Sequence, residues 1–254
     1  MNVLAGEALA VSPEAVKHHA AQGSGTSLVL LGTTGGVSWW PKTTRASSSS
    51  AIVVGETIYI VDIGQGSTSR LSEAFNTEPI VKGNRYCGTG SSTFLRNVKA
   101  LFFTHIHNDH IADYPNLLLI GPGAGLGALS PLKVIGPYDR GQLDINNTGF
   151  DESKLVYTDS ADHALITPTP GTCQMTDLIW QAFAQTINDM TLDNVYPDFR
   201  SLVEVTEIGT KLPTKDSPTC PVTPPFLIYP EDEIGVEVWA TLVDHHQVYP
   251  IQHP

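Results

Sequence analysis

The sequence predicts an α/β fold, because apolar segments of strand length alternate with segments of helical periodicity. A continuous apolar run at residues 27–31 predicts a strand buried on both faces, and residues 51–61 are typical of a β-hairpin. A further strand is expected at residues 98–104, and apolar side chains recur at helical spacing in residues 111–120. The clearest long helix is expected at residues 175–190, where apolar side chains share one face.

Length and composition predict a globular chain. The 254 residues suffice for one domain with a substantial core, and 41% of them are hydrophobic. The three cysteines are scattered and form no disulfide framework. No apolar run approaches about 18 residues, so we expect no membrane span. The N-terminus shows no intact signal peptide, so a cytoplasmic chain is expected, with a processed secreted chain as the alternative.

The charge balance argues against nucleic acid as the main partner. The formal net charge is −12, and no Lys/Arg-rich run is present. Since neutralising phosphates requires a basic surface, we expect a small-molecule substrate and regard nucleic acid as a disfavoured partner.

Four potential metal ligands follow the strand at residues 98–104, and we call them the His–Asp cluster. They are His105, His107, Asp109 and His110. Alternate side chains of an extended segment share a face, so His105 and His107 can point the same way. Asp109 and His110 stand near the helix start and can be aimed at a neighbouring point. Three imidazoles with a carboxylate predict a zinc, iron or manganese site, whereas a lone His-x-His would usually be a solvated loop.

Other polar and aromatic residues are candidates for supporting roles. Asp62 ends a strand and could accept an N–H from a ligand histidine and so fix its tautomer. The alternative, that Asp62 caps the following helix, is compatible with this role. Asp113 is expected to be a solvated acid of the first helical turn. Trp39 and Trp40 either line a pocket or anchor their loop by packing.

The His–Asp cluster matches the His-x-His-x-Asp-His signature of the metallo-β-lactamase superfamily. Residues 30–36 resemble the first strand and Gly-rich turn of its RNase Z-like branch, and residues 61–66 resemble that branch's Asp-x-Gly-x-Gly segment. The resemblance covers residues 27–119 well and residues 235–250 less specifically.

This resemblance implies an αββα sandwich that binds two metal ions, zinc by expectation, with manganese or iron as alternatives. It assigns His105, His107 and His245 to the first ion, and Asp109 and His110 to the second. Asp109 would also orient the attacking water. His245 follows a strand expected at residues 234–243, as the third histidine does in the superfamily, and His246 is the alternative ligand.

The superfamily carries two later ligands, a bridging Asp and a final His, for which this sequence offers no candidate. We therefore expect an N-terminal extension at residues 1–26 and a C-terminally incomplete metallo-β-lactamase-type domain at residues 27–254. A helical insertion around residues 174–190 would wall the site. An incomplete sandwich would also favour a homo-oligomer, because it leaves apolar surface uncovered.

The expected function is metal-dependent hydrolysis of a small ester, lactone, sulfate ester or phosphodiester through a metal-activated water. An RNase Z-like endoribonuclease is the first alternative. A catalytically impaired metal-binding remnant is the second, since the later ligands are missing.

Overall fold

The computed structural model describes residues 25–36, 39–40, 43–76, 93–139, 156, 158–159, 166–167, 169–193, 198–209 and 224–243. The chain divides into two compact units. The first comprises Met1–Pro137 and Gly171–Glu207, and the second comprises Tyr138–Pro170 and Ile208–Pro254. The predicted boundaries at residues 26 and 27 and the predicted insertion stay predictions.

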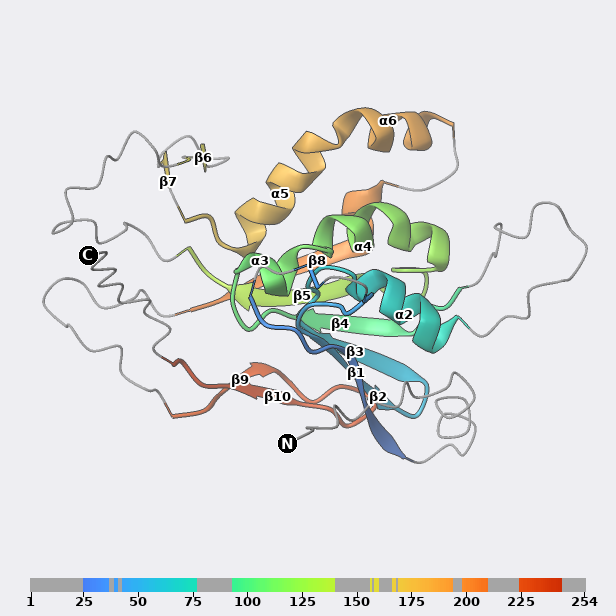
Figure 1. Cartoon of the computed structure of the whole chain (residues 1–254). Coiled ribbons are helices and arrows are strands. Elements are labelled where there is room, and N and C mark those ends of the chain that lie inside the picture. Colours follow the sequence, from blue (N-terminus) through green and yellow to red (C-terminus); the bar gives the residue numbers. More distant parts are fainter. Residues whose placement is uncertain are drawn as a thin grey trace, which may run out of the picture. The chain divides into compact units, whose positions relative to one another are not determined.

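A six-stranded mixed sheet forms the centre of the first unit (Figure 1). Its order is β1-β2-β3-β4-β5-β8. The strands are β1 (Thr26–Gly32), β2 (Ser49–Val54), β3 (Thr57–Val61), β4 (Val98–Phe102), β5 (Leu132–Pro137) and β8 (Val203–Ile208). β1, β2 and β3 pair antiparallel, whereas β3, β4 and β5 pair parallel. The predicted α/β class is confirmed.

Helices cover one face of this sheet. They are α2 (Ser67–Phe75), α3 (Asn108–Ile111), α4 (Tyr114–Ile120), η1 (Gly121–Ala124), α5 (Thr172–Ala182), α6 (Ala184–Leu192) and η3 (Phe199–Leu202). The core lies between this face and the helices, where Ile60 and Leu101 of the strands pack with Leu71 of α2 and Leu117 of α4. Burial of these apolar side chains is the main force that holds the helices on the sheet.

The structure corrects two predictions, one for a helix and one for a strand. The helix expected at residues 175–190 is two helices, because Phe183 (φ −109°, ψ 18°) leaves the helical conformation between α5 and α6. The strand at residues 27–31 is not buried on both faces. β1 is an edge strand, and Leu28 and Leu30 are 65% and 63% exposed, while Leu31 faces the core.

The second unit contains two small antiparallel pairs, β6 (Thr158–Asp159) with β7 (Ile166–Thr167) and β9 (Phe226–Tyr229) with β10 (Val238–Ala240). The strand expected at residues 234–243 is therefore shorter than predicted. Its first residues form a turn, since the Asp232 carboxylate accepts hydrogen bonds from the backbone N–H groups of Ile234 and Val236. In the described part of the chain, no helix has the length and apolarity needed to span a membrane.

Candidate metal centre

The carboxyl ends of two neighbouring parallel strands bring the candidate ligands together. Asp62 follows β3 and Thr104 follows β4, and these strands are paired in parallel. The Asp62 N–H donates to the Phe102 carbonyl at 2.8 Å, which fixes the two strand ends side by side. Ligands commonly bind at this edge of parallel sheets, because loops from adjacent strands converge there.

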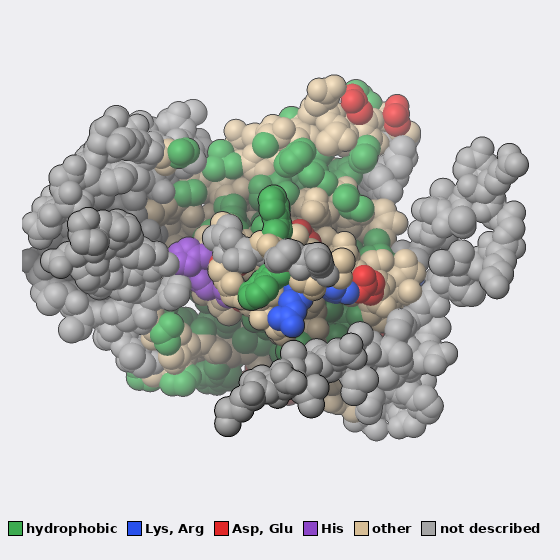
Figure 2. Space-filling model, in the orientation of Figure 1, with side chains coloured by type: hydrophobic (Ala, Val, Ile, Leu, Met, Phe, Trp, Pro, Cys, Tyr) green, Lys and Arg blue, Asp and Glu red, His purple; other side chains and the backbone are tan. Residues whose placement is uncertain are grey.

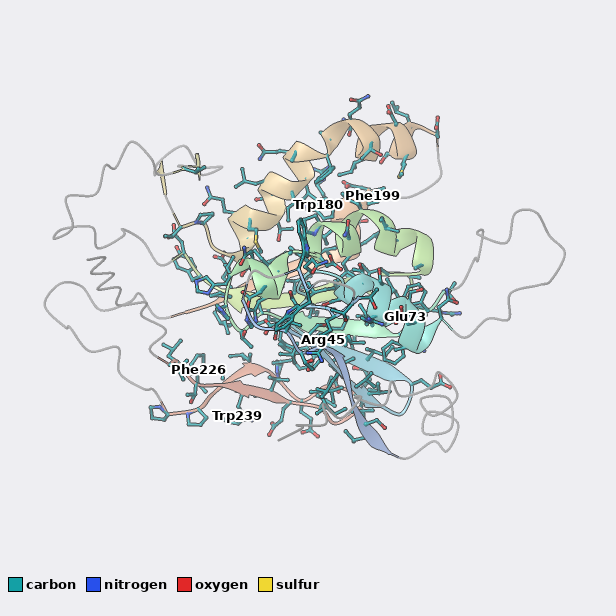
Figure 3. The ribbon with its side chains drawn as sticks, viewed as in Figure 1. Arg45, Glu73, Trp180, Phe199, Phe226 and Trp239 are labelled. Atoms are coloured by element: carbon teal, nitrogen blue, oxygen red, sulfur yellow. The ribbon has the colours of Figure 1, made fainter. Side chains whose placement is uncertain are left out.

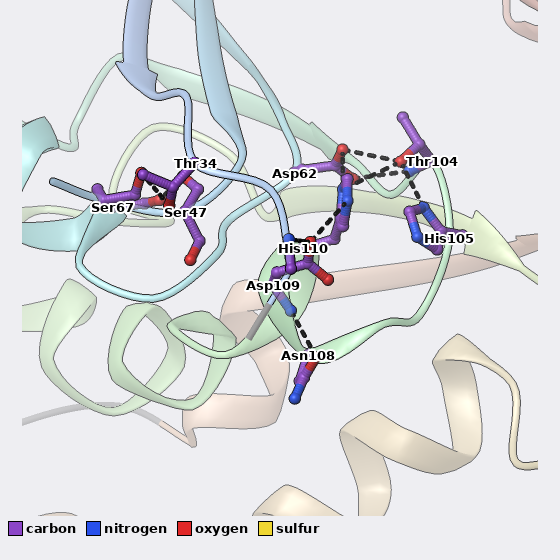
Figure 4. Close-up of polar contacts among 11 residues, drawn as sticks. Thr34, Ser47, Asp62, Ser67, Thr104, His105, Asn108, Asp109 and His110 are labelled. Carbon is purple, nitrogen blue, oxygen red and sulfur yellow. Dashed lines mark hydrogen bonds and ion pairs between the residues drawn. The ribbon is translucent and has the colours of Figure 1, made fainter. Parts of the chain in front are cut away.

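The buried Asp62 carboxylate organises the loop after β4 (Figure 4). Its Oδ1 accepts the Thr104 N–H at 2.8 Å, and its Oδ2 accepts the Thr104 hydroxyl at 2.8 Å. The same Oδ2 lies 2.7 Å from Nδ1 of His110. A proton on Nδ1 satisfies this contact and leaves the Nε2 lone pair of His110 available to a metal. Asp62 thus contacts a predicted ligand histidine, as expected from the sequence, and its effect on a bound metal stays a prediction.

Three imidazole rings of the His–Asp cluster are neighbours. The ring centroid of His105 is 4.6 Å from that of His107 and 3.9 Å from that of His110. Nδ1 of His105 lies 3.1 Å from the Thr104 hydroxyl, so Thr104 touches two of the predicted ligands as well as Asp62. Histidine side chains reach the surface on the face drawn in Figure 2.

Asp109 joins the cluster to the Gly-rich turn after β1. Its Oδ2 lies 3.6 Å from Nε2 of His110 and accepts the Gly36 N–H at 2.7 Å. Burial raises the pKa of the Asp109 carboxyl. The hydrogen bond from Gly36 and the charges of His110 and His105 outweigh this effect, so the pKa lies below its usual value. The side chain is therefore a carboxylate at neutral pH, the form that binds metals.

Close backbone packing places α3, which carries Asp109 and His110. Ile63 donates its N–H to the His110 carbonyl at 2.7 Å, and the Asp113 N–H donates to the Ile63 carbonyl at 3.0 Å. A Cβ atom on Gly64 would lie 2.0 Å from the Asp109 carbonyl oxygen. Only glycine allows this approach, which gives the Asp-x-Gly-x-Gly segment a physical reason.

Asp113 has a role that the sequence analysis missed. It is buried rather than solvated, and its Oδ2 accepts the Thr68 N–H at 2.8 Å and the Thr68 hydroxyl at 2.7 Å. Asp113 thus binds the first turn of α2, the helix that Asp62 was a candidate to cap. Asp113 lies three residues after His110, which was the sequence signal for a role near the site. Its partner Thr68 lies 45 residues earlier in the sequence, so this spacing did not indicate the contact.

The donor set fits a divalent metal such as zinc by its chemistry. It combines neighbouring imidazoles, one with its tautomer fixed by a buried carboxylate, and an ionised carboxylate. Within the described ranges, no three His, Cys, Asp or Glu side chains already form a group that could hold the ion. The predicted third histidine of the first site, His245 or its alternative His246, lies outside the described residues.

A cavity of about 360 Å³ opens beside Asp109. It is lined by Gly36, Trp39, Ser47, Gln65, Asn108, Asp109 and Ala112. The sequence left two interpretations for the tryptophan pair: the rings line a pocket, or they anchor their loop by packing. Trp39 agrees with the first, since it lines this cavity. Trp40 is in contact with Arg45, whose guanidinium carbon lies 5.8 Å from the ring centroid.

Comparison with known proteins points to RNase Z enzymes. No family model matches the chain. The mitochondrial ribonuclease Z 2 of Schizosaccharomyces pombe is 28% identical over 116 residues, which cover 46% of this chain and 15% of that protein. Ribonuclease Z of Pseudomonas putida is 33% identical over 113 residues, which cover 43% of this chain and 28% of that protein.

Among solved structures, the short form of human tRNase Z matches at 17% identity and a TM-score of 0.37. The match covers 74% of this chain and 46% of that structure. The chain spans less than a third of the length of the two curated relatives.

These relatives overturn one prediction. We regarded nucleic acid as a disfavoured partner, but the similar proteins are ribonucleases by name, so that expectation was wrong. Its basis was the net charge of the whole chain, an average that carries no information about the local surface around a site. The comparisons confirm the resemblance read from the motifs: over the part of its length that aligns, the chain is RNase Z-like in sequence.

Proposed function

We propose that this chain is a metal-dependent hydrolase that cleaves phosphodiester bonds in RNA, with tRNA as the first candidate substrate. The observation that carries the proposal is the contact between Asp62, directly after β3, and His110, on α3, within a cluster of three histidines. The similarity to ribonuclease Z enzymes favours RNA over the small esters, lactones and sulfate esters that the sequence alone left first.

Each candidate residue has its own role at the proposed site. His105 and His107 would contribute to a first ion, with His245 as the predicted third ligand, and Asp109 and His110 to a second. Bound zinc would polarise the scissile phosphoryl group and lower the pKa of water, to about 7 in favourable sites. Asp62 holds the Nδ1 proton of His110, and the ionised Asp109 would orient the attacking water.

The proposal is tested by metal analysis and RNA cleavage on the same preparation. We expect zinc-like ions in the purified protein and cleavage of an end-labelled precursor tRNA that is lost with EDTA and restored by zinc. His105→Ala should lose both metal and cleavage, whereas Leu192→Ala, at an 82% exposed position of α6, should keep both.

Two outcomes contradict the proposal, and each points elsewhere. Hydrolysis of chromogenic esters without cleavage of RNA would return the substrate to the small-ester class. A preparation that cleaves neither substrate and binds one metal ion or none would support the impaired remnant.

A further inference from the structure

We propose that Trp39 is the stacking wall of a nucleobase subsite beside the His–Asp cluster. This inference deepens the proposed function and rests on it, since it names the part of an RNA substrate that the cavity holds. The cavity of about 360 Å³ falls in the range of ligand pockets, about 300–1,000 Å³.

The side chain of Trp39 is presented to solvent in a way that folding alone does not favour. It is 87% exposed, although tryptophan is among the side chains that gain most from burial. Trp40, beside it, is 48% exposed and has the Arg45 guanidinium on its ring. Trp39 therefore offers a large aromatic surface to a ligand in the pocket that it lines.

Described residues on either side of Trp39 are held by hydrogen bonds. On one side, the Gly36 N–H donates to Asp109 at 2.7 Å. On the other side, Nη2 of Arg70 donates to the Thr44 hydroxyl at 2.7 Å, and the Arg70 guanidinium also pairs with Glu73 of α2. Figure 3 labels Glu73 on this helix. Fixed positions at Gly36 and Thr44 lower the ordering cost of binding, because less of the chain has to be ordered when the ligand arrives.

The rest of the lining fits a flat ring with polar edges. The exposed lining is mostly apolar, and it includes the polar residues Ser47, Gln65 and Asn108. A nucleobase presents a π-face to an aromatic side chain and hydrogen-bonding edges to polar groups of this type.

The position of the pocket relates the base to the chemistry. Asp109 both lines the cavity and belongs to the His–Asp cluster. A nucleotide connects its base to its phosphate through one ribose. A base stacked on Trp39 therefore leaves the adjoining phosphodiester next to the candidate ligands, and Trp39 acts as a positioning residue for the scissile bond.

The test measures RNA binding without metal, so that it does not depend on cleavage. The probe is a fluorescein-labelled six-nucleotide single-stranded RNA, titrated with full-length protein in EDTA and followed by anisotropy. Stacking of one base predicts that Trp39→Ala weakens binding by about 5- to 100-fold. Trp39→Phe should retain most of the affinity, and Leu192→Ala should match the wild type.

An RNA of the same length without bases separates stacking from backbone contacts. On this probe Trp39→Ala and the wild type should bind equally, because there is no base to stack. Two results overturn the subsite: Trp39→Ala loses affinity equally for both probes, or it binds the normal RNA as tightly as the wild type does. Neither result contradicts RNA as the substrate. A wild-type protein that binds neither probe overturns the subsite and the proposed RNA substrate together.

Discussion

Substitution of Asp62 tests the organisation of the candidate metal centre most directly. Its carboxylate accepts hydrogen bonds at 2.8 Å from the Thr104 N–H, 2.8 Å from the Thr104 hydroxyl and 2.7 Å from His110. The residue is 3% exposed, so bulk water does not compete for these hydrogen bonds. Asp62 also has a left-handed backbone with φ 57°, which costs alanine about 1–2 kcal/mol.

We expect Asp62→Ala to lower the free energy of unfolding by about 3–5 kcal/mol, because three hydrogen-bond donors lose their acceptor, at about 1–3 kcal/mol for each buried group left unsatisfied. Metal affinity should fall by about 10- to 100-fold, because His110 loses the group that fixes its tautomer. Asp62→Asn keeps the volume and tolerates the left-handed backbone, so it should lose metal affinity with a smaller loss of stability.

Urea unfolding in EDTA measures the first effect, and zinc titration against a chromophoric chelator measures the second. The matched control is Asp198→Asn, which removes a carboxylate paired with Arg200 at the surface and should leave zinc affinity unchanged. Asp62 variants that fold and bind zinc as tightly as the wild type would refute the argument that this carboxylate supports the site.

Two further predictions concern backbone packing and thiol chemistry. Gly64→Ala should destabilise the chain by about 3 kcal/mol or more in urea unfolding, because the new Cβ would lie 2.0 Å from the Asp109 carbonyl oxygen. Gly55→Ala, where φ is 61° but space is open, should cost only about 1–2 kcal/mol, and equal losses would contradict the packing argument. Burial and the Glu207 carboxylate raise the pKa of Cys173 to about 11, so its alkylation, followed by mass spectrometry of its peptide, should accelerate as pH rises from 9 to 11. In the unfolded chain the Cys173 thiol ionises at lower pH than in the folded chain, so the free energy of unfolding should fall as pH rises from 9 to 11. Glu207→Gln should speed alkylation at pH 9, and an unchanged rate would contradict the role of the Glu207 carboxylate.

The elements that the sequence predicted well are those whose signals are local. The hairpin of β2 and β3 and the strand β4 are contiguous apolar segments with turn residues between or after them. The neighbourhood of His105, His107 and His110 also follows from spacing alone, since the three residues span one strand end and one helix start.

The parts that escaped prediction depend on contacts between distant segments. Val203 and Val205 of β8 alternate with polar residues over only six positions, and their place as the sixth strand is set by the sheet. The burial of Asp113 depends on Thr68, and the exposure of Leu28 depends on which face of β1 the helices cover. Side-chain periodicity indicates which face is apolar, but it does not indicate which neighbour arrives to cover it.

The hydrogen bond from Gly36 to Asp109 gives the site a thermodynamic consequence. One carboxylate oxygen serves the turn after β1 and lies beside His110. An ion bound at Asp109 Oδ2 would share this oxygen with the Gly36 N–H, so ion binding and the position of Gly36 would be energetically coupled. Coupling free energies are reciprocal: if zinc changes the affinity for a ligand on Trp39 by some factor, that ligand changes the affinity for zinc by the same factor.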